Sequence, residues 1–86
     1  MIIKYSRDAI KFLERQPKKT VERVRQAIGK LALFPPEGDI SLLRGYADGR
    51  MRLRVGSLRV IYRRIMEGQI EIILIIDIGS RGGIYK

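Results

Sequence analysis

The fold is decided by one stretch near the middle of the chain, Arg50-Met51-Arg52-Leu53-Arg54-Val55-Gly56-Ser57. Its first six residues alternate between basic and apolar, and successive side chains of a β-strand point to opposite faces of a sheet. The stretch therefore predicts a strand over residues 50–55 with three arginines on one face and three apolar side chains on the other. Gly56-Ser57 suits a two-residue hairpin turn, so we expect the next strand to return antiparallel to this one.

Two more strands are expected after this turn, over residues 58–66 and 69–78, joined by a second tight turn at Glu67-Gly68. In the last strand, alternate apolar residues share one face, which we expect to lie against the helices: Ile70, Ile72, Leu74, Ile76 and Ile78. Ile73 and Ile75 on the opposite face predict that this strand is central in the sheet.

The N-terminal half predicts one strand and two helices. A short strand over residues 2–5 is followed by Ser6, which suits a helix N-cap because its hydroxyl can accept from a free backbone amide. Apolar residues at helical spacing predict helices over 7–15 and 18–34, with Pro17 between them. A loop is expected from there to Gly49, with Leu42 and Leu43 packed onto the body.

The predicted order is β-α-α-β-β-β, an α+β fold of one domain spanning residues 1–86. We expect the two helices to form a hairpin on one face of a small antiparallel sheet, with the first strand at the edge. The other face of the sheet is left open, and Arg52 and Arg54 are expected to point from it.

Composition limits the classes of function. Lys and Arg number 18 against nine Asp and Glu, a formal charge of +9, which favours a polyanion such as nucleic acid as the partner. The chain has no cysteine and no histidine, so thiolate sites, imidazole ligands and imidazole catalysis are excluded. We expect no cofactor and no metal. No apolar run is long enough for a membrane span, so a cytoplasmic protein is expected.

The candidate site lies on the open face. Arg59 falls on the same face of its strand as Arg63, and the turn should bring Arg59 near Arg54. Arg81 and Tyr85 follow the last strand, so several guanidinium groups and one phenol could line a cationic pocket. Guanidinium groups bind phosphate oxygens in pairs and keep their charge when partly buried.

Such a pocket fits RNA strand cleavage, in which the ribose 2′-hydroxyl attacks the adjacent phosphate and negative charge builds on the phosphorane oxygens. Fixed guanidinium groups can stabilise that charge, and neighbouring positive charge would lower the pKa of a phenol such as Tyr85, allowing it to act as a base. The sequence shows no clustered carboxylates for a metal.

Simpler interpretations stay open at this stage. Arg50, Arg52 and Arg54 could form the solvated face of an amphipathic strand, and Arg63 could contact an acidic partner. Tyr85 could serve packing alone. Tyr46 could stack on a base or pack against the body. Tyr62 is expected in the core.

Several segments, in this order and spacing, resemble the RelE/ParE superfamily of bacterial type II toxins, in its RelE-like branch. They are Ser6-Arg7-Asp8-Ala9-Ile10-Lys11-Phe12-Leu13, Leu42-Leu43-Arg44-Gly45, the stretch from Met51 to Tyr62, and Ile78-Gly79-Ser80-Arg81-Gly82-Gly83-Ile84-Tyr85-Lys86. Ser80 departs from the pattern, because many members have His or Lys there.

The resemblance implies a toxin that enters the ribosomal A site and cuts mRNA without a metal. It implies that Arg52 and Arg54 hold the mRNA backbone. Arg50 and Arg63 are predicted beside them as further RNA contacts. Arg59 would stabilise the phosphorane, Arg81 would stabilise charge or protonate the leaving oxygen, and Tyr85 would act as base or stack on the substrate. It also implies a cognate antitoxin protein that blocks this face. Two other readings are a ParE-like gyrase poison and an inactive relative that only binds RNA or antitoxin.

Overall fold

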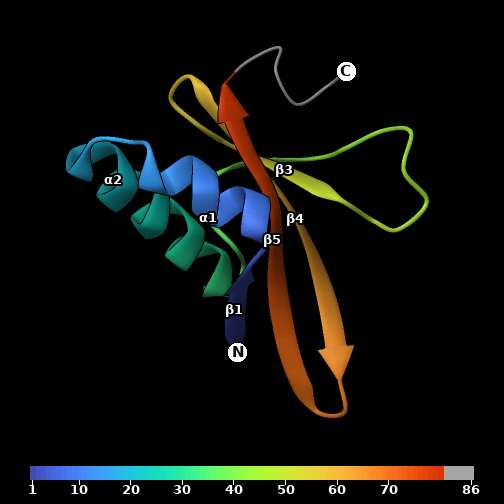
Figure 1. The fold of residues 1–86 in the computed structure, drawn as a ribbon. Helices are drawn as coiled ribbons and strands as arrows, with labels where there is room; N and C mark the ends of the chain where they lie inside the picture. The colour runs from blue at the N-terminus through green and yellow to red at the C-terminus, as the bar shows by residue number, and fades with distance from the viewer. Residues whose placement is uncertain (81–86) are drawn as a thin grey trace.

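The structure, a computed structural model, describes residues 1–80 as two helices packed on a five-stranded sheet (Figure 1). The elements, in chain order, are β1 (Ile2–Tyr5), α1 (Arg7–Glu14), α2 (Lys18–Gly29), the 3₁₀-helix η1 (Lys30–Ala32), β2 (Asp39–Leu42), β3 (Met51–Val55), β4 (Leu58–Glu67) and β5 (Ile70–Ser80). The strand order is β1-β5-β4-β3-β2. The α+β class is confirmed, but the sheet is mixed because the edge strand β1 runs parallel to β5.

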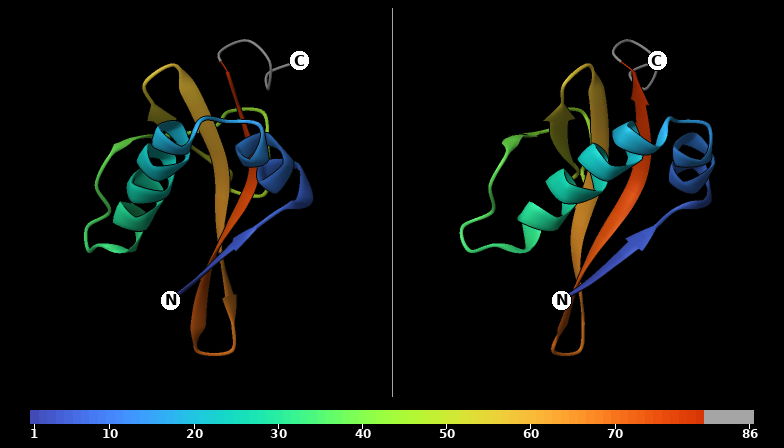
Figure 2. Two further views of the ribbon diagram at one scale, coloured as in Figure 1. Left: turned by 60° about the vertical axis from the view of Figure 1, so that its left-hand side comes forward. Right: turned by 90° about the vertical axis from the view of Figure 1, so that its left-hand side faces the viewer.

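The helices lie together on one side of the sheet, and no helix of the described residues covers the other side (Figures 1 and 2). Helix α1 packs on β5, and α2 packs on β3. The tip of the β4–β5 hairpin extends beyond the helices in all three views. This arrangement leaves the predicted open face uncovered by helix.

Ser6 caps α1, as predicted, and also ties the helix to the sheet. Its Oγ accepts from the backbone N–H of Ala9 at 3.1 Å and donates to the carbonyl of Ile76 at 2.6 Å. Its backbone N–H donates to the carbonyl of Ile75 at 2.8 Å. One residue therefore fixes both the start of α1 and its position on β5.

The second helix is shorter than the sequence predicts. Helix α2 ends at Gly29, and only the short η1 follows, ending at Ala32, so a continuous helix over residues 18–34 is wrong. Glycine has a low helix propensity, and Pro35 and Pro36 lie a few residues further on, where a helix could not continue. No helix within residues 1–80 has the length and apolar character needed to cross a membrane.

The predicted meander of strands is confirmed for β3, β4 and β5. Val55 pairs with Leu58 across the predicted hairpin turn, where Gly56 has a φ of +59°, a conformation that glycine adopts without strain. The sequence missed β2, which pairs antiparallel with β3. Leu42 belongs to β2 and is 64% exposed, so its predicted packing onto the body is wrong.

The prediction of which face of β5 meets the helices is also wrong over most of the strand. Ile73, Ile75 and Ile78 lie in the core with Leu53 and Tyr62. Tyr62 pairs with Ile75 while the preceding residue of β4 pairs with Asp77, so β5 carries one extra residue, Ile76, at a β-bulge. The bulge shifts the alternation by one residue, so only Ile78 of the five predicted residues faces the helices.

Candidate nucleic-acid interface

The five described arginines predicted for the site lie on or beside the uncovered face of the sheet, which we call the open face. Register and side-chain contacts order them in three rows across β3 and β4, namely Arg54 with Arg59, then Arg52, then Arg50 with Arg63. Rows are two residues apart along a strand, roughly 7 Å. The open face is therefore a ladder of guanidinium groups on two central strands.

The first row places two like charges directly opposite each other. Arg54 and Arg59 are register partners, an arrangement that costs stability in a sheet. Asp39 of β2 offsets part of this charge, with 3.7 Å between its Oδ2 and the Nε of Arg54, in a solvent-exposed pair. Arg59 is only 8% exposed and is the one charged residue among the buried residues of the described chain. A buried arginine beside a second arginine is a costly feature that suits anion binding.

Arg52 forms the second row. It pairs with Ile61 of β4, which in turn pairs with Asp77 of β5. Its Nε is buried, and within residues 1–80 it makes no hydrogen bond. Asp77 reaches this face because of the bulge, and its Oδ1 accepts from the backbone N–H of Ile78 at 2.9 Å. Arg52 as a whole is thus half-buried on this face.

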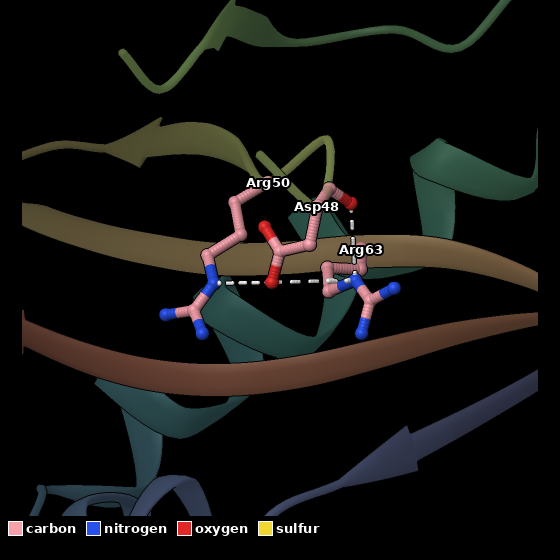
Figure 3. Close-up of polar contacts among 3 residues, drawn as sticks. All are labelled: Asp48, Arg50 and Arg63. Carbon is pink, nitrogen blue, oxygen red and sulfur yellow. Dashed lines mark hydrogen bonds and ion pairs between the residues drawn. The ribbon is translucent and has the colours of Figure 1, made fainter. Parts of the chain in front are cut away.

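The third row is organised by Asp48, in the loop between β2 and β3 (Figure 3). The Nε of Arg50 donates to Asp48 Oδ2 at 2.9 Å, and the Nε of Arg63 lies 3.7 Å from the same oxygen. Arg63 also donates from Nε to the backbone carbonyl of Asp48 at 3.2 Å. The hydrogen bond from Arg50, with the nearby charges of Arg50 and Arg63, lowers the pKa of Asp48. The guanidinium of Arg50 lies over the ring of Tyr46, 4.4 Å from its centroid.

The structure brings together Arg50, Arg52, Arg54, Arg59 and Arg63, although Arg50 immediately precedes β3 and is not part of the strand. Arg81 and Tyr85 lie outside the described residues. Tyr62 is 1% exposed in the core, as predicted, and its burial raises the pKa of its phenol.

Sequence reasoning missed two carboxylates. Asp48 was expected only as part of a loop, and Asp77 was not considered. The alternation that directs Ile78 toward the helices could have placed Asp77 on the open face, because the two residues are adjacent in the strand. Across residues 1–80, no group of three or more acidic side chains is placed to hold a metal ion.

Comparison with known proteins identifies the family. The family model described as ParE toxin of type II toxin-antitoxin system, parDE, matches residues 3–85. No curated protein matches the chain at a significant level.

Among solved structures, the archaeal RelE–RelB complex from Pyrococcus horikoshii OT3 contains a chain 28% identical to this one, with 95% of this chain and 96% of that chain covered and a TM-score of 0.72. A YoeB/ParE toxin from Agrobacterium tumefaciens is 21% identical, with 94% and 99% covered and a TM-score of 0.73. The RelB–RelE antitoxin–toxin complex from Methanococcus jannaschii is 21% identical, with 95% and 94% covered and a TM-score of 0.70. Since the family model spans nearly the whole chain, this protein belongs to the ParE toxin family of type II toxin–antitoxin systems, within the RelE/ParE superfamily.

Proposed function

We propose that this toxin is a ribosome-dependent endoribonuclease that cuts mRNA in the ribosomal A site and so inhibits translation. The observation that carries the proposal is the register pair Arg54 and Arg59 on the open face, with Arg59 almost fully buried. Two guanidinium groups held at one place against their mutual repulsion suit a phosphate group, which can accept hydrogen bonds from both. The 28% identity to the archaeal RelE chain supports the same branch of the superfamily.

In the proposed reaction, the 2′-oxygen of a ribose forms a bond to the adjacent phosphorus while the bond from phosphorus to the 5′-oxygen breaks. The products are a 2′,3′-cyclic phosphate and a 5′-hydroxyl. Arg59 faces the developing charge on the phosphorane oxygens from a fixed position, where a preorganised donor is most effective. Arg54 holds the backbone in the same row as Arg59, and Arg52 holds it one row away.

Proton transfer is assigned to the C-terminal segment. Tyr85 takes the proton of the 2′-hydroxyl, and Arg81 stabilises charge or protonates the leaving oxygen. Both residues lie outside the described part of the chain, so these two roles rest on the resemblance of the sequence segment around them. The ribosome is assigned the task of aligning the 2′-hydroxyl with the phosphate, which can account for a large part of the rate.

We also propose an antitoxin as a partner of this chain. The similar archaeal structures are complexes of RelE with RelB, and the formal charge of +9 on this chain favours an acidic partner. An extended acidic segment on the open face would neutralise the arginines of the first two rows and exclude mRNA from them.

The test is a map of mRNA 5′-ends shortly after the toxin is induced without an antitoxin. New ends in translation frame, absent with Arg81→Ala and with Arg59→Ala, are the expected result. Purified toxin should cut mRNA on translating ribosomes much faster than free mRNA. Efficient cutting of free mRNA, or cutting that ignores the reading frame, would contradict ribosome dependence.

A gyrase poison is the second candidate, because the matching family model is described as a ParE toxin. Here the open face would contact a protein–DNA complex and perform no chemistry on RNA. Purified toxin would then trap gyrase on cleaved plasmid DNA and leave ribosome-bound mRNA intact. An inactive relative that only binds RNA or antitoxin would give neither result.

A further inference from the structure

We propose that Arg50, held by Asp48 and stacked on Tyr46, recognises a guanine base in the RNA. The inference rests on the proposed RNA function and adds a base preference at the third row of the open face. It separates this row from the rows that contain Arg52, Arg54 and Arg59, which suit phosphate.

Arg50 is held on two sides. One face of its guanidinium covers the ring of Tyr46, with 4.4 Å from the guanidinium carbon to the ring centroid. Its Nε is fixed by the 2.9 Å hydrogen bond to Asp48 Oδ2. Stacking and a charge-assisted hydrogen bond together restrict a side chain that otherwise has many rotamers. A restricted side chain loses less entropy on binding, which suits recognition of one particular group.

The free edge of Arg50 carries two parallel donors. Within residues 1–80, neither Nη1 nor Nη2 of Arg50 makes a hydrogen bond, and the side chain is 30% exposed. This pair of donors matches two acceptors side by side, either two oxygens of a phosphate or the O6 and N7 atoms of guanine. Arg50 is therefore available for a two-point contact, and the surroundings decide between the two partners.

Asp48 favours the base over the phosphate. Its carboxylate lies between Arg50 and Arg63, at 2.9 Å and 3.7 Å from their Nε atoms, which lower its pKa. Like any ordinary aspartate it is ionised at neutral pH. A phosphate bound at this row would lie beside a fixed negative charge, which is unfavourable. The acceptor edge of guanine is neutral and lacks that penalty. An acidic protein segment would meet the same repulsion as a phosphate.

Arg52 gives the contrast within the same face. Among the described residues Arg52 forms no ion pair with a carboxylate, although Asp77 stands in its row, and Asp39 lies 3.7 Å from Arg54 in an exposed pair. Neither of these carboxylates is hydrogen-bonded to an arginine among the described residues, as Asp48 is to Arg50, so these rows oppose an approaching phosphate less. Two rows of the sheet, roughly 13 Å, separate Arg63 from Arg59 on β4. One short segment of RNA can therefore contact phosphate at the first two rows and present a base at the third.

The test uses RNA hexamers with 2′-O-methyl riboses, which cannot be cut by 2′-hydroxyl attack. Three hexamers differ at one position, which holds guanine, adenine or 7-deazaguanine, the last lacking only the N7 acceptor. Dissociation constants are measured by fluorescence anisotropy for the full chain. We expect the wild type to bind the guanine hexamer about tenfold more tightly than either of the others.

Arg50→Lys keeps the charge and removes the fork of donors, so it should bind all three hexamers equally. The matched control is Arg54→Lys, the same change in the first row, which should weaken binding of all three while keeping the preference for guanine. Asp48→Asn tests the positioning residue. It should reduce the preference while raising the affinity for every hexamer, because a negative charge is lost; a merely structural role would not produce this combination.

Equal affinity of the wild type for the three hexamers would overturn the inference, as would no saturable binding at millimolar RNA. A preference that survives in Arg50→Lys would overturn it too. If an acidic peptide competes in an Arg50-dependent way while the guanine preference does not depend on Arg50, the row is a protein contact. These hexamers cannot be cleaved, so binding is measured apart from cleavage. A protein that prefers guanine but cuts no mRNA would refute the proposed nuclease activity and leave guanine recognition by Arg50 standing.

Discussion

The two faces of β3 and β4 have opposite chemistry although they alternate residue by residue along the same strands. On the helix side, Leu53, Val60 and Tyr62 are each at most 1% exposed and belong to the core. On the open face, Arg54 and Arg59 stand opposite each other. The alternation allows two central strands to stabilise the fold and to present charge at the same time. Substitutions at neighbouring positions should therefore separate stability from activity.

Leu53→Ala should have the largest effect on stability. Removing a buried leucine side chain in a well-packed core costs about 2–5 kcal/mol of unfolding free energy, a large share of the total for a small domain. The matched control is Arg54→Ala, the next residue on the other face, which should change stability by about 1 kcal/mol or less. Urea denaturation followed by circular dichroism measures both. Similar losses of unfolding free energy for the two variants would refute the conclusion that the helix side, and not the open face, stabilises the fold.

Arg59→Met tests the effect of one arginine on mRNA cleavage separately from its effect on stability. We expect the rate of mRNA cleavage on ribosomes to fall about 10²- to 10³-fold, as for loss of one preorganised donor. The unfolding free energy of the variant is measured beside the rate, so that a loss of cleavage by a folded protein is distinguished from a loss of folding.

Arg59→Lys provides the control, since it retains the charge and loses the planar fork. It should recover only part of the rate. Wild-type cleavage by Arg59→Met would remove this residue from the proposed chemistry, whatever its effect on stability.

The sequence predicted those features that depend on alternation and local turns. Arg52 and Arg54 alternate with the apolar residues of β3, so their common location followed directly from the period of a strand. The cap at Ser6 and the hairpin turn at Gly56 are local signals, each requiring a particular residue type. Tyr62 was expected in the core and lies there.

The errors arose where the signal is not local. In β5 both faces are apolar, so the pattern did not identify which face meets the helices, and the extra residue Ile76 shifted the alternation. Strand β2 has four residues and is exposed at Leu42, so it carried little hydrophobic pattern. The link from Asp48 to Arg63 spans 15 residues and depends on the path of a loop. Pairing across the fold, not composition, placed that carboxylate in the site.

Ser6→Ala tests how the helix side supports the open face. Ser6 binds the carbonyls of Ile75 and Ile76, at the bulge that sends Asp77 to the open face. Loss of the hydroxyl removes the cap and one bond to β5, and we expect a cost of about 1–2 kcal/mol. Ser57→Ala is a matched control, because Ser57 is exposed in the hairpin turn and should change stability by about 0.5 kcal/mol or less. Equal values for both serines in thermal unfolding would show that the cap contributes little.

Tyr62→Phe should have the smallest effect on stability at neutral pH, and it should change how stability depends on alkaline pH. Burial raises the pKa of Tyr62 above its usual value of 10.0, so the folded state holds this proton more tightly than the unfolded state. The resulting stability is fully present below about pH 10 and is lost as pH rises through the folded pKa. Unfolding free energies at pH 7 and pH 11 should therefore differ less for Tyr62→Phe than for the wild type, with a change of about 1 kcal/mol or less at pH 7. Cleavage should be unchanged, because Tyr62 faces the helices; a variant that keeps the full alkaline loss of stability would place its cause in other groups.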